Sequence, residues 1–69
     1  MIKNKLRYRM ADKQIDDITA LMELSGVSRN TINKLYKDKQ VETIKLETLF
    51  RLCDALECNL SDLIEYTVE

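Results

Sequence analysis

The chain has 69 residues, of which 45% are hydrophobic and 33% charged, and its formal net charge is −1. This length allows one domain at most, and the composition is that of a globular protein rather than a disordered one. The chain has no histidine, no nucleophile–base pair and no apolar run long enough for a membrane span, which argues against an enzyme and against a membrane protein.

Two short helices are predicted in the first part of the chain. Residues 4–12 form the first, because Leu6 and Met10 are one helical turn apart. Residues 17–24 form the second, and either aspartate of the preceding pair can cap it. Gly26 ends this helix, because glycine readily takes the left-handed conformation found at helix C-termini.

A third helix is predicted over residues 28–38, with Ser28 as its N-cap. Its buried side is marked by apolar residues at helical spacing: Ile32, Leu35 and Tyr36. The opposite side is a continuous polar stripe without an acidic residue, formed by Arg29, Asn30, Asn33, Lys34 and Lys37.

A fourth helix is predicted to begin at residues 43–45 and to bury one apolar stripe: Leu46, Leu49, Phe50, Cys53 and Leu56. Asn59 caps a fifth helix, with Asp62 three residues later as a weak capping box. Beyond it, Ile64, Tyr66 and Val68 alternate at a spacing of two, which indicates a strand. Its edge can pair with a second copy or with residues 1–3, and a frayed terminus is the alternative.

Charge is unevenly distributed along the chain. Residues 1–40 hold nine basic and five acidic residues, whereas residues 41–69 hold two basic and seven acidic ones. Such polarity fits a surface that faces phosphate on one side and water or a partner on the other, although solvated helix surfaces also carry charge.

The two cysteines, Cys53 and Cys58, are five residues apart, which is not a zinc-binding pattern. No signal peptide precedes them, so we expect a reducing cytoplasmic location. We interpret both as small apolar side chains in or near the core, and we predict neither a metal nor a cofactor.

The polar stripe has the chemistry needed to recognise DNA. Asparagine can pair with adenine and arginine with guanine in the major groove, and lysines can reach phosphates. The predicted base-reading residues are Arg29, Asn30 and Asn33, with Thr31 as a helper. The predicted phosphate-binding residues are Ser28, Lys34, Lys37 and Lys39.

The stretch "ITALMELSGVSRNTINKLYK", residues 18–37, resembles the helix-turn-helix unit of the Cro/repressor-type (xenobiotic-response-element) DNA-binding family. The following "IKLETLFRLCDALECNLSDLIEY", residues 44–66, is similar to that family's fourth and fifth helices. The resemblance implies an all-α, compact five-helix bundle of the lambda-repressor type, with short terminal strands as an option. We expect one such domain over residues 1–69.

Several residues depart from the family's usual pattern. Ile18 stands where a phosphate-binding glutamine is common, and Met22 where a small residue packs in the helix crossing. Asp38 and Glu57 follow the third and fourth helices where the family usually has glycine. At such positions the backbone often adopts a positive φ.

The resemblance and the stripe together predict sequence-specific binding of double-stranded DNA by a transcriptional regulator. We expect a repressor that inserts helix 28–38 into the major groove and acts as a homodimer on an inverted-repeat operator, without a small-molecule ligand. The alternative is a protein-interaction module of the same fold without DNA binding. The acid-free stripe favours DNA, because an interaction module has little need to keep it.

Overall fold

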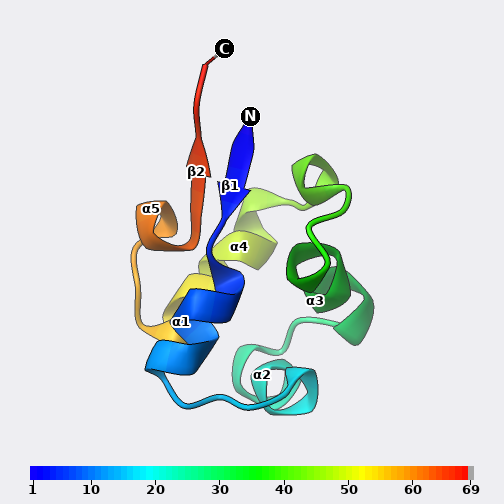
Figure 1. Ribbon diagram of the computed structural model, residues 1–69. Coiled ribbons are helices and arrows are strands. Elements are labelled where there is room, and N and C mark those ends of the chain that lie inside the picture. Colours follow the sequence, from blue (N-terminus) through cyan, green and yellow to red (C-terminus); the bar gives the residue numbers. More distant parts are fainter. Residues whose placement is uncertain (69) are drawn as a thin grey trace.

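The computed structural model describes residues 1–68 and consists mainly of short helices around one core (Figure 1). In chain order the elements are β1 (Ile2–Asn4), α1 (Leu6–Asp12), α2 (Ile18–Ser25), α3 (Arg29–Tyr36), the 3-10 turn η1 (Val41–Thr43), α4 (Leu46–Leu56), α5 (Leu60–Leu63) and β2 (Ile64–Tyr66). This arrangement confirms the predicted all-α bundle with short terminal strands. The third helix is shorter than the predicted 28–38, because Ser28 only caps it and Lys37 ends it.

Every helix contributes to a single apolar core. Its buried members are Leu6, Met10, Leu21, Val27, Ile32, Leu35, Val41, Leu49, Leu52, Cys53, Leu56 and Leu63. Because this core is small, each side chain in it contributes a large share of the stability of the fold.

The predicted buried stripe of α4 is partly wrong. Leu46 and Phe50 are exposed, and Leu52 is fully buried instead. Apolar residues cover more than half of the circumference of this helix, so their spacing alone does not fix which side packs inward. The neighbouring helices select the side that carries Leu49, Leu52 and Leu56.

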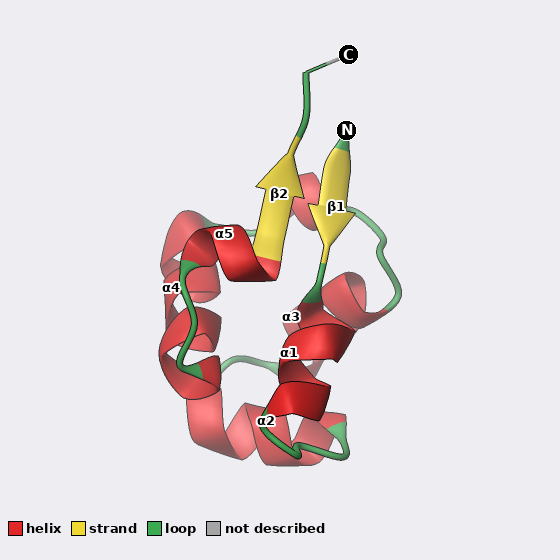
Figure 2. Cartoon of the chain, turned by 60° about the vertical axis from the view of Figure 1, so that its left-hand side comes forward, coloured by secondary structure: helices red, strands yellow, loops and turns green. Residues whose placement is uncertain are grey.

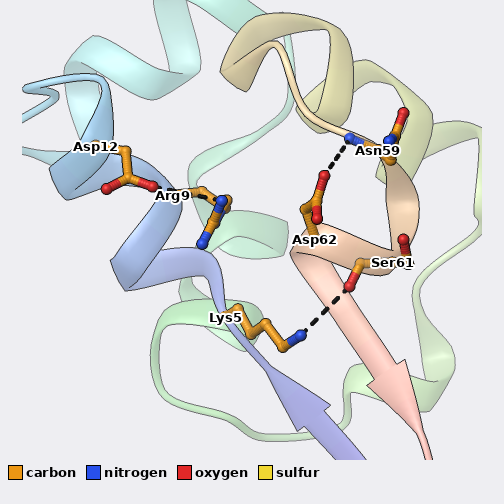
Figure 3. Close-up of polar contacts among 6 residues, drawn as sticks. All are labelled: Lys5, Arg9, Asp12, Asn59, Ser61 and Asp62. Carbon is orange, nitrogen blue, oxygen red and sulfur yellow. Dashed lines mark hydrogen bonds and ion pairs between the residues drawn. The ribbon is translucent and has the colours of Figure 1, made fainter.

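The predicted helix ends are largely confirmed. The Asp17 carboxylate accepts a hydrogen bond from the Ala20 backbone N–H at 2.8 Å and so caps α2. Gly26 ends α2 with φ of 72°. At the start of α5 the Asp62 carboxylate accepts a hydrogen bond from the Asn59 backbone N–H at 3.1 Å (Figure 3).

Replacing Gly26 should test how much the left-handed turn contributes to stability. A Cβ at this position would meet no heavy atom within 4 Å, so the cost of Gly26→Ala comes from the backbone conformation alone. We expect Gly26→Ala to lower the free energy of unfolding, measured in urea, by about 1–2 kcal/mol. Gly26→Asn is the matched control. It should lose less stability than Gly26→Ala, because asparagine tolerates the left-handed backbone conformation. Equal losses for both variants would contradict this explanation.

The two positions where glycine is usual in the family do adopt the left-handed conformation. Asp38 has φ of 56° and Glu57 has φ of 52°. The turns after α3 and α4 therefore form without glycine, at the cost of local backbone strain.

The terminal strands pair with each other within the chain. They are antiparallel, with Ile2 opposite Tyr66 and Asn4 opposite Ile64. Figure 2 shows that the sheet of β1 and β2 extends beyond the helices on one side of the molecule. The predicted C-terminal strand is thus confirmed, and it pairs with the N-terminal residues.

The segment between β1 and α1 is also tied to α5. The Lys5 backbone N–H donates to the Leu63 carbonyl at 2.8 Å, and the Lys5 ammonium donates to the Ser61 carbonyl at 3.4 Å. Figure 3 shows the second contact beside the Arg9–Asp12 ion pair of α1, whose closest atoms are 3.4 Å apart. The two hydrogen bonds of Lys5 hold the start of α1 against α5.

Cys53 and Cys58 meet at the C-terminal end of α4. The Cys58 backbone N–H donates to the Cys53 carbonyl at 3.1 Å, in the hydrogen-bond pattern that commonly brings two apolar side chains together at a helix end. Burial, and then the neighbouring Cys58 thiol, raise the pKa of Cys53 to about 11. The Cys53 thiol is therefore protonated at neutral pH and packs as an apolar group.

This protonation state should make Cys53 slow to alkylate. At about pH 8, iodoacetamide should modify half-buried Cys58 well before Cys53, as measured by peptide mass spectrometry. Because the folded-state pKa is above the usual 9.0, the stability gained from the neutral thiol is present below pH 9 and is lost as the pH rises to about 11. Alkylation of both cysteines at equal rates in the folded chain would contradict the assignment.

Candidate nucleic-acid interface

Helices α2 and α3 form a compact two-helix unit. Leu21 of α2, Val27 of the turn and Ile32 of α3 are all buried between them and the rest of the core. Gly26 allows the chain to reverse within three residues, so α3 starts at Arg29 directly after the turn. In Figure 1, α3 lies on the right-hand side of the molecule and α5 on the left.

The C-terminal end of α3 is held by the N-terminal segment of the chain. The Asn4 side-chain amide donates to the Leu35 carbonyl, and the Arg7 guanidinium donates to the Tyr36 carbonyl at 3.0 Å. The guanidinium carbon of Arg7 also lies 4.2 Å from the centroid of the Tyr36 ring. These contacts satisfy carbonyls that a helix end leaves free, and they fix α3 against β1 and α1.

The outward side of α3 and the loop that follows it surround one shallow hollow. Three lysines and three amide side chains line it: Asn30, Asn33, Lys34, Lys37, Lys39 and Gln40. None of these residues is acidic, so the hollow combines positive charge with many hydrogen-bond donors. The structure thus brings together five of the eight residues predicted to contact DNA.

Arg29 lies outside this hollow, at the N-terminal end of α3. It is exposed, and its guanidinium donates a hydrogen bond to the Thr19 hydroxyl of α2. The side chain is therefore anchored across the two helices of the unit before any ligand binds.

Ser28 and Thr31 bond to each other at the start of α3. The Ser28 hydroxyl oxygen accepts a hydrogen bond from the Thr31 backbone N–H at 3.3 Å, which confirms Ser28 as the N-cap. The same hydroxyl donates to the Thr31 hydroxyl at 3.0 Å. In the unbound chain both side chains thus stabilise the N-terminus of α3.

A second hollow joins α3 to the beginning of α4. It is lined by Thr31, Lys34, Thr43, Ile44, Lys45 and Thr48. The Lys34 ammonium donates to the Thr43 hydroxyl at 3.3 Å and so lies between the two hollows. The polar surface consequently continues from α3 to the first turn of α4.

Gln40 and Lys45 are among the residues of this surface that were not predicted from the sequence. Neither belongs to the helix that carries the polar stripe, and both reach the surface only through the path of the loop after α3. Gln40 has φ of 53°, which no local sequence pattern signals. Lys45 could have been identified as a basic residue at the start of the predicted fourth helix.

The residues of α2 that depart from the family's usual pattern face the core. Ile18 and Met22 are half-buried and pack against the core. The Ile18 side chain therefore offers no hydrogen-bond donor to a phosphate. The Asp17 carboxylate next to it is engaged in the cap of α2.

The site can hold an anionic, hydrogen-bonding ligand. Its lysines suit phosphates, and its amides can both donate and accept at a base edge. Among residues 1–68, no three Cys, Asp or Glu side chains gather in a way that could hold a metal ion. In the same part of the chain, no helix has the length and apolar character needed to cross a membrane.

A protein-family model described as a Cro/C1-type HTH DNA-binding domain matches residues 5–69. The match spans every helix and the C-terminal strand, and it includes both hollows on α3. A search of curated proteins found no match.

Proposed function

Because the chain belongs to the Cro/C1-type helix-turn-helix family of DNA-binding domains, we propose that it recognises a specific DNA sequence and regulates transcription as a repressor. In this proposal α3 enters the major groove of double-stranded DNA. The supporting observation is the acid-free hollow on α3, which is lined by three amide side chains and three lysines.

The proposed base-reading residues lie along the outward side of α3. Asn30 and Asn33 are one helical turn apart, so each amide can face a different base pair. Arg29 lies at the leading end of the helix, where its guanidinium suits guanine. Thr31 is the fourth proposed base contact, through its methyl or hydroxyl group. The groove, about 12 Å wide, accommodates a helix with side chains of this size.

The proposed phosphate contacts surround these readers. Lys37 and Lys39 are exposed at the end of α3 and in the loop, and Lys34 lies on the side facing α4. Ser28 contributes through the N-terminus of α3, where free backbone N–H groups and the helix dipole favour an anion. Such contacts fix the orientation of the helix in the groove without selecting a sequence.

Repression is the mode of regulation that needs the fewest further contacts. A protein bound over a promoter excludes polymerase by occupying the same DNA. In this proposal the α3 surface makes the DNA contacts that repression requires.

The proposal includes a homodimer on an inverted repeat. One recognition helix contacts only a few base pairs, which is too little to select one site among the competing sequences of a genome. Two copies related by a two-fold axis double the contacts. Their half-site centres should then lie about 34–36 Å apart, one turn of DNA.

Selection from random duplex DNA tests the proposed function. Repeated binding and amplification with the full chain should enrich a single inverted repeat. The matched control is the double variant Asn30→Ala/Asn33→Ala, which keeps the charge of the surface and the buried side of α3. It should bind DNA without enriching that repeat. Enrichment of the same sequence by both proteins, or of none by the wild type, would contradict the proposal.

A further inference from the structure

Helix α4 carries an apolar pair that faces solvent. The exposed fraction is 59% for Leu46 and 51% for Phe50. These two residues are one helical turn apart, so their side chains lie next to each other on the helix surface. A single exposed apolar residue is ordinary, but an adjacent leucine and phenylalanine form a patch that another protein surface can cover.

An ion pair lies beside this apolar pair. The Arg51 guanidinium is 3.2 Å from the Glu47 carboxylate, and both side chains are more than half exposed. Residues 46 and 50 therefore form one row along α4, and residues 47 and 51 form a neighbouring row. Each row spans one turn, and the middle of both rows is near residues 48–49.

This geometry is self-complementary. If a second α4 packs antiparallel with a two-fold axis near residues 48–49, Leu46 meets Phe50 of the partner subunit. The same axis places Glu47 opposite Arg51 of the partner subunit, and the reverse pair forms by symmetry. A two-fold interface requires this kind of matching, in which one patch binds its own copy.

The location of the patch is compatible with DNA binding. The first turn of α4 lines a hollow together with Thr31 and Lys34 of α3. None of residues 46, 47, 50 and 51 lines the hollow on the outward side of α3, so a dimer through α4 leaves that hollow free. The terminal strands offer the competing surface, since the edges of β1 and β2 that do not face each other are open to another strand.

We propose that Leu46, Glu47, Phe50 and Arg51 of α4 form the homodimer surface, and that its occupant is α4 of a second copy. The inference rests on the proposed function in one respect, since an operator with inverted repeats calls for a two-fold dimer. The dimer then sets the spacing of the two recognition helices.

Sedimentation of the full chain at tens of micromolar tests the surface. The wild type should be a dimer, and Phe50→Glu should raise the dimer dissociation constant by at least about tenfold. The matched control is Tyr66→Glu, which alters an exposed aromatic residue of β2 and should leave the constant unchanged. Far-UV circular dichroism checks that each variant is folded.

Charge reversal gives the sharper test. Glu47→Arg alone and Arg51→Glu alone each place like charges across the two-fold axis, so each variant should be monomeric. An equimolar mixture of the two should recover dimers, because every cross-axis contact in the mixed dimer joins Arg to Glu. Recovery on mixing cannot arise from the contact within one chain. Dimers that persist in both single variants, or no recovery on mixing, would overturn the proposal.

Failure of the α4 dimer surface can be distinguished from failure of the proposed DNA-binding function. The monomeric variants should still bind a duplex that carries a single half-site, measured by fluorescence anisotropy. If Tyr66→Glu breaks the dimer and the α4 variants do not, or if the wild type is monomeric, the α4 surface is wrong. Half-site binding would then still support DNA recognition, whereas its loss in the folded wild type would reject the proposed function itself.

Discussion

Affinity for the operator should fall by about 10³–10⁵-fold between about 50 and 200 mM salt, if the dimer contacts roughly six to ten phosphates. The physical reason is release of counterions from DNA when the lysines of the α3 surface neutralise phosphates. A titration of labelled duplex followed by fluorescence anisotropy, repeated over a salt series, measures the slope directly.

Two lysine variants show whether the slope arises at α3. Lys37→Ala should make the log–log slope less steep by about one per subunit. Lys3→Ala is the matched control, because Lys3 is also exposed but lies on β1 of the terminal sheet. It should leave the slope unchanged. An affinity that does not depend on salt would exclude phosphate binding by this surface.

Asn33→Ala and Arg29→Ala should each cost about 1–3 kcal/mol on the best site and relax the preference at one base pair. The loss arises because a base edge that was paired with the side chain is left without its partner. Lys37→Ala should instead weaken binding to all sequences about equally. Competition binding against a panel of single-base variants of the operator distinguishes the two patterns.

The same variants should keep the stability of the fold. Arg29 and Lys37 are exposed, and Asn33 is half-buried on the outward side of α3. The free energy of unfolding, measured by thermal denaturation, should therefore change by no more than about 0.5 kcal/mol in each variant. A uniform loss of affinity over the whole panel for all three variants would mean that the base-reading assignment is wrong.

The sequence was sufficient wherever a feature depends on neighbours along the chain. The N-cap at Ser28 and the C-cap at Gly26 were predicted correctly, and Asp17 is one of the two aspartates predicted to cap α2, because each cap satisfies backbone groups within one turn. The inward side of α3 was also predicted correctly. Ile32 and Leu35 are the core residues of a short helix whose other side is strongly polar.

Features that depend on distant segments were predicted less well. Helix α4 is apolar over much of its surface, and only its packing against the other helices shows that Leu46 and Phe50 face solvent. The support of α3 by Asn4 and Arg7 was not predicted at all. These contacts join residues about thirty positions apart, and no periodic pattern encodes them.

In the candidate site, too, the residues placed by local helical spacing were predicted and those placed by the tertiary fold were missed. The residues on α3 itself were predicted because helical spacing places them on one side. Gln40 and Lys45 were missed because the loop after α3 brings them to that side. The hydrogen bond from Arg29 to Thr19 likewise depends on the crossing of α2 and α3, which spacing alone does not give.

The central claim is that the outward side of α3 reads base pairs in the major groove, and modified bases in the selected operator test it most directly. Replacing single half-site purines with 7-deazapurines removes an acceptor in the major groove, whereas 3-deazaadenine removes one in the minor groove. At one or more half-site positions, the 7-deaza change should cost about 1–3 kcal/mol of binding free energy, and the 3-deaza change should cost little. Sensitivity to 3-deazaadenine together with indifference to every 7-deazapurine would contradict the account.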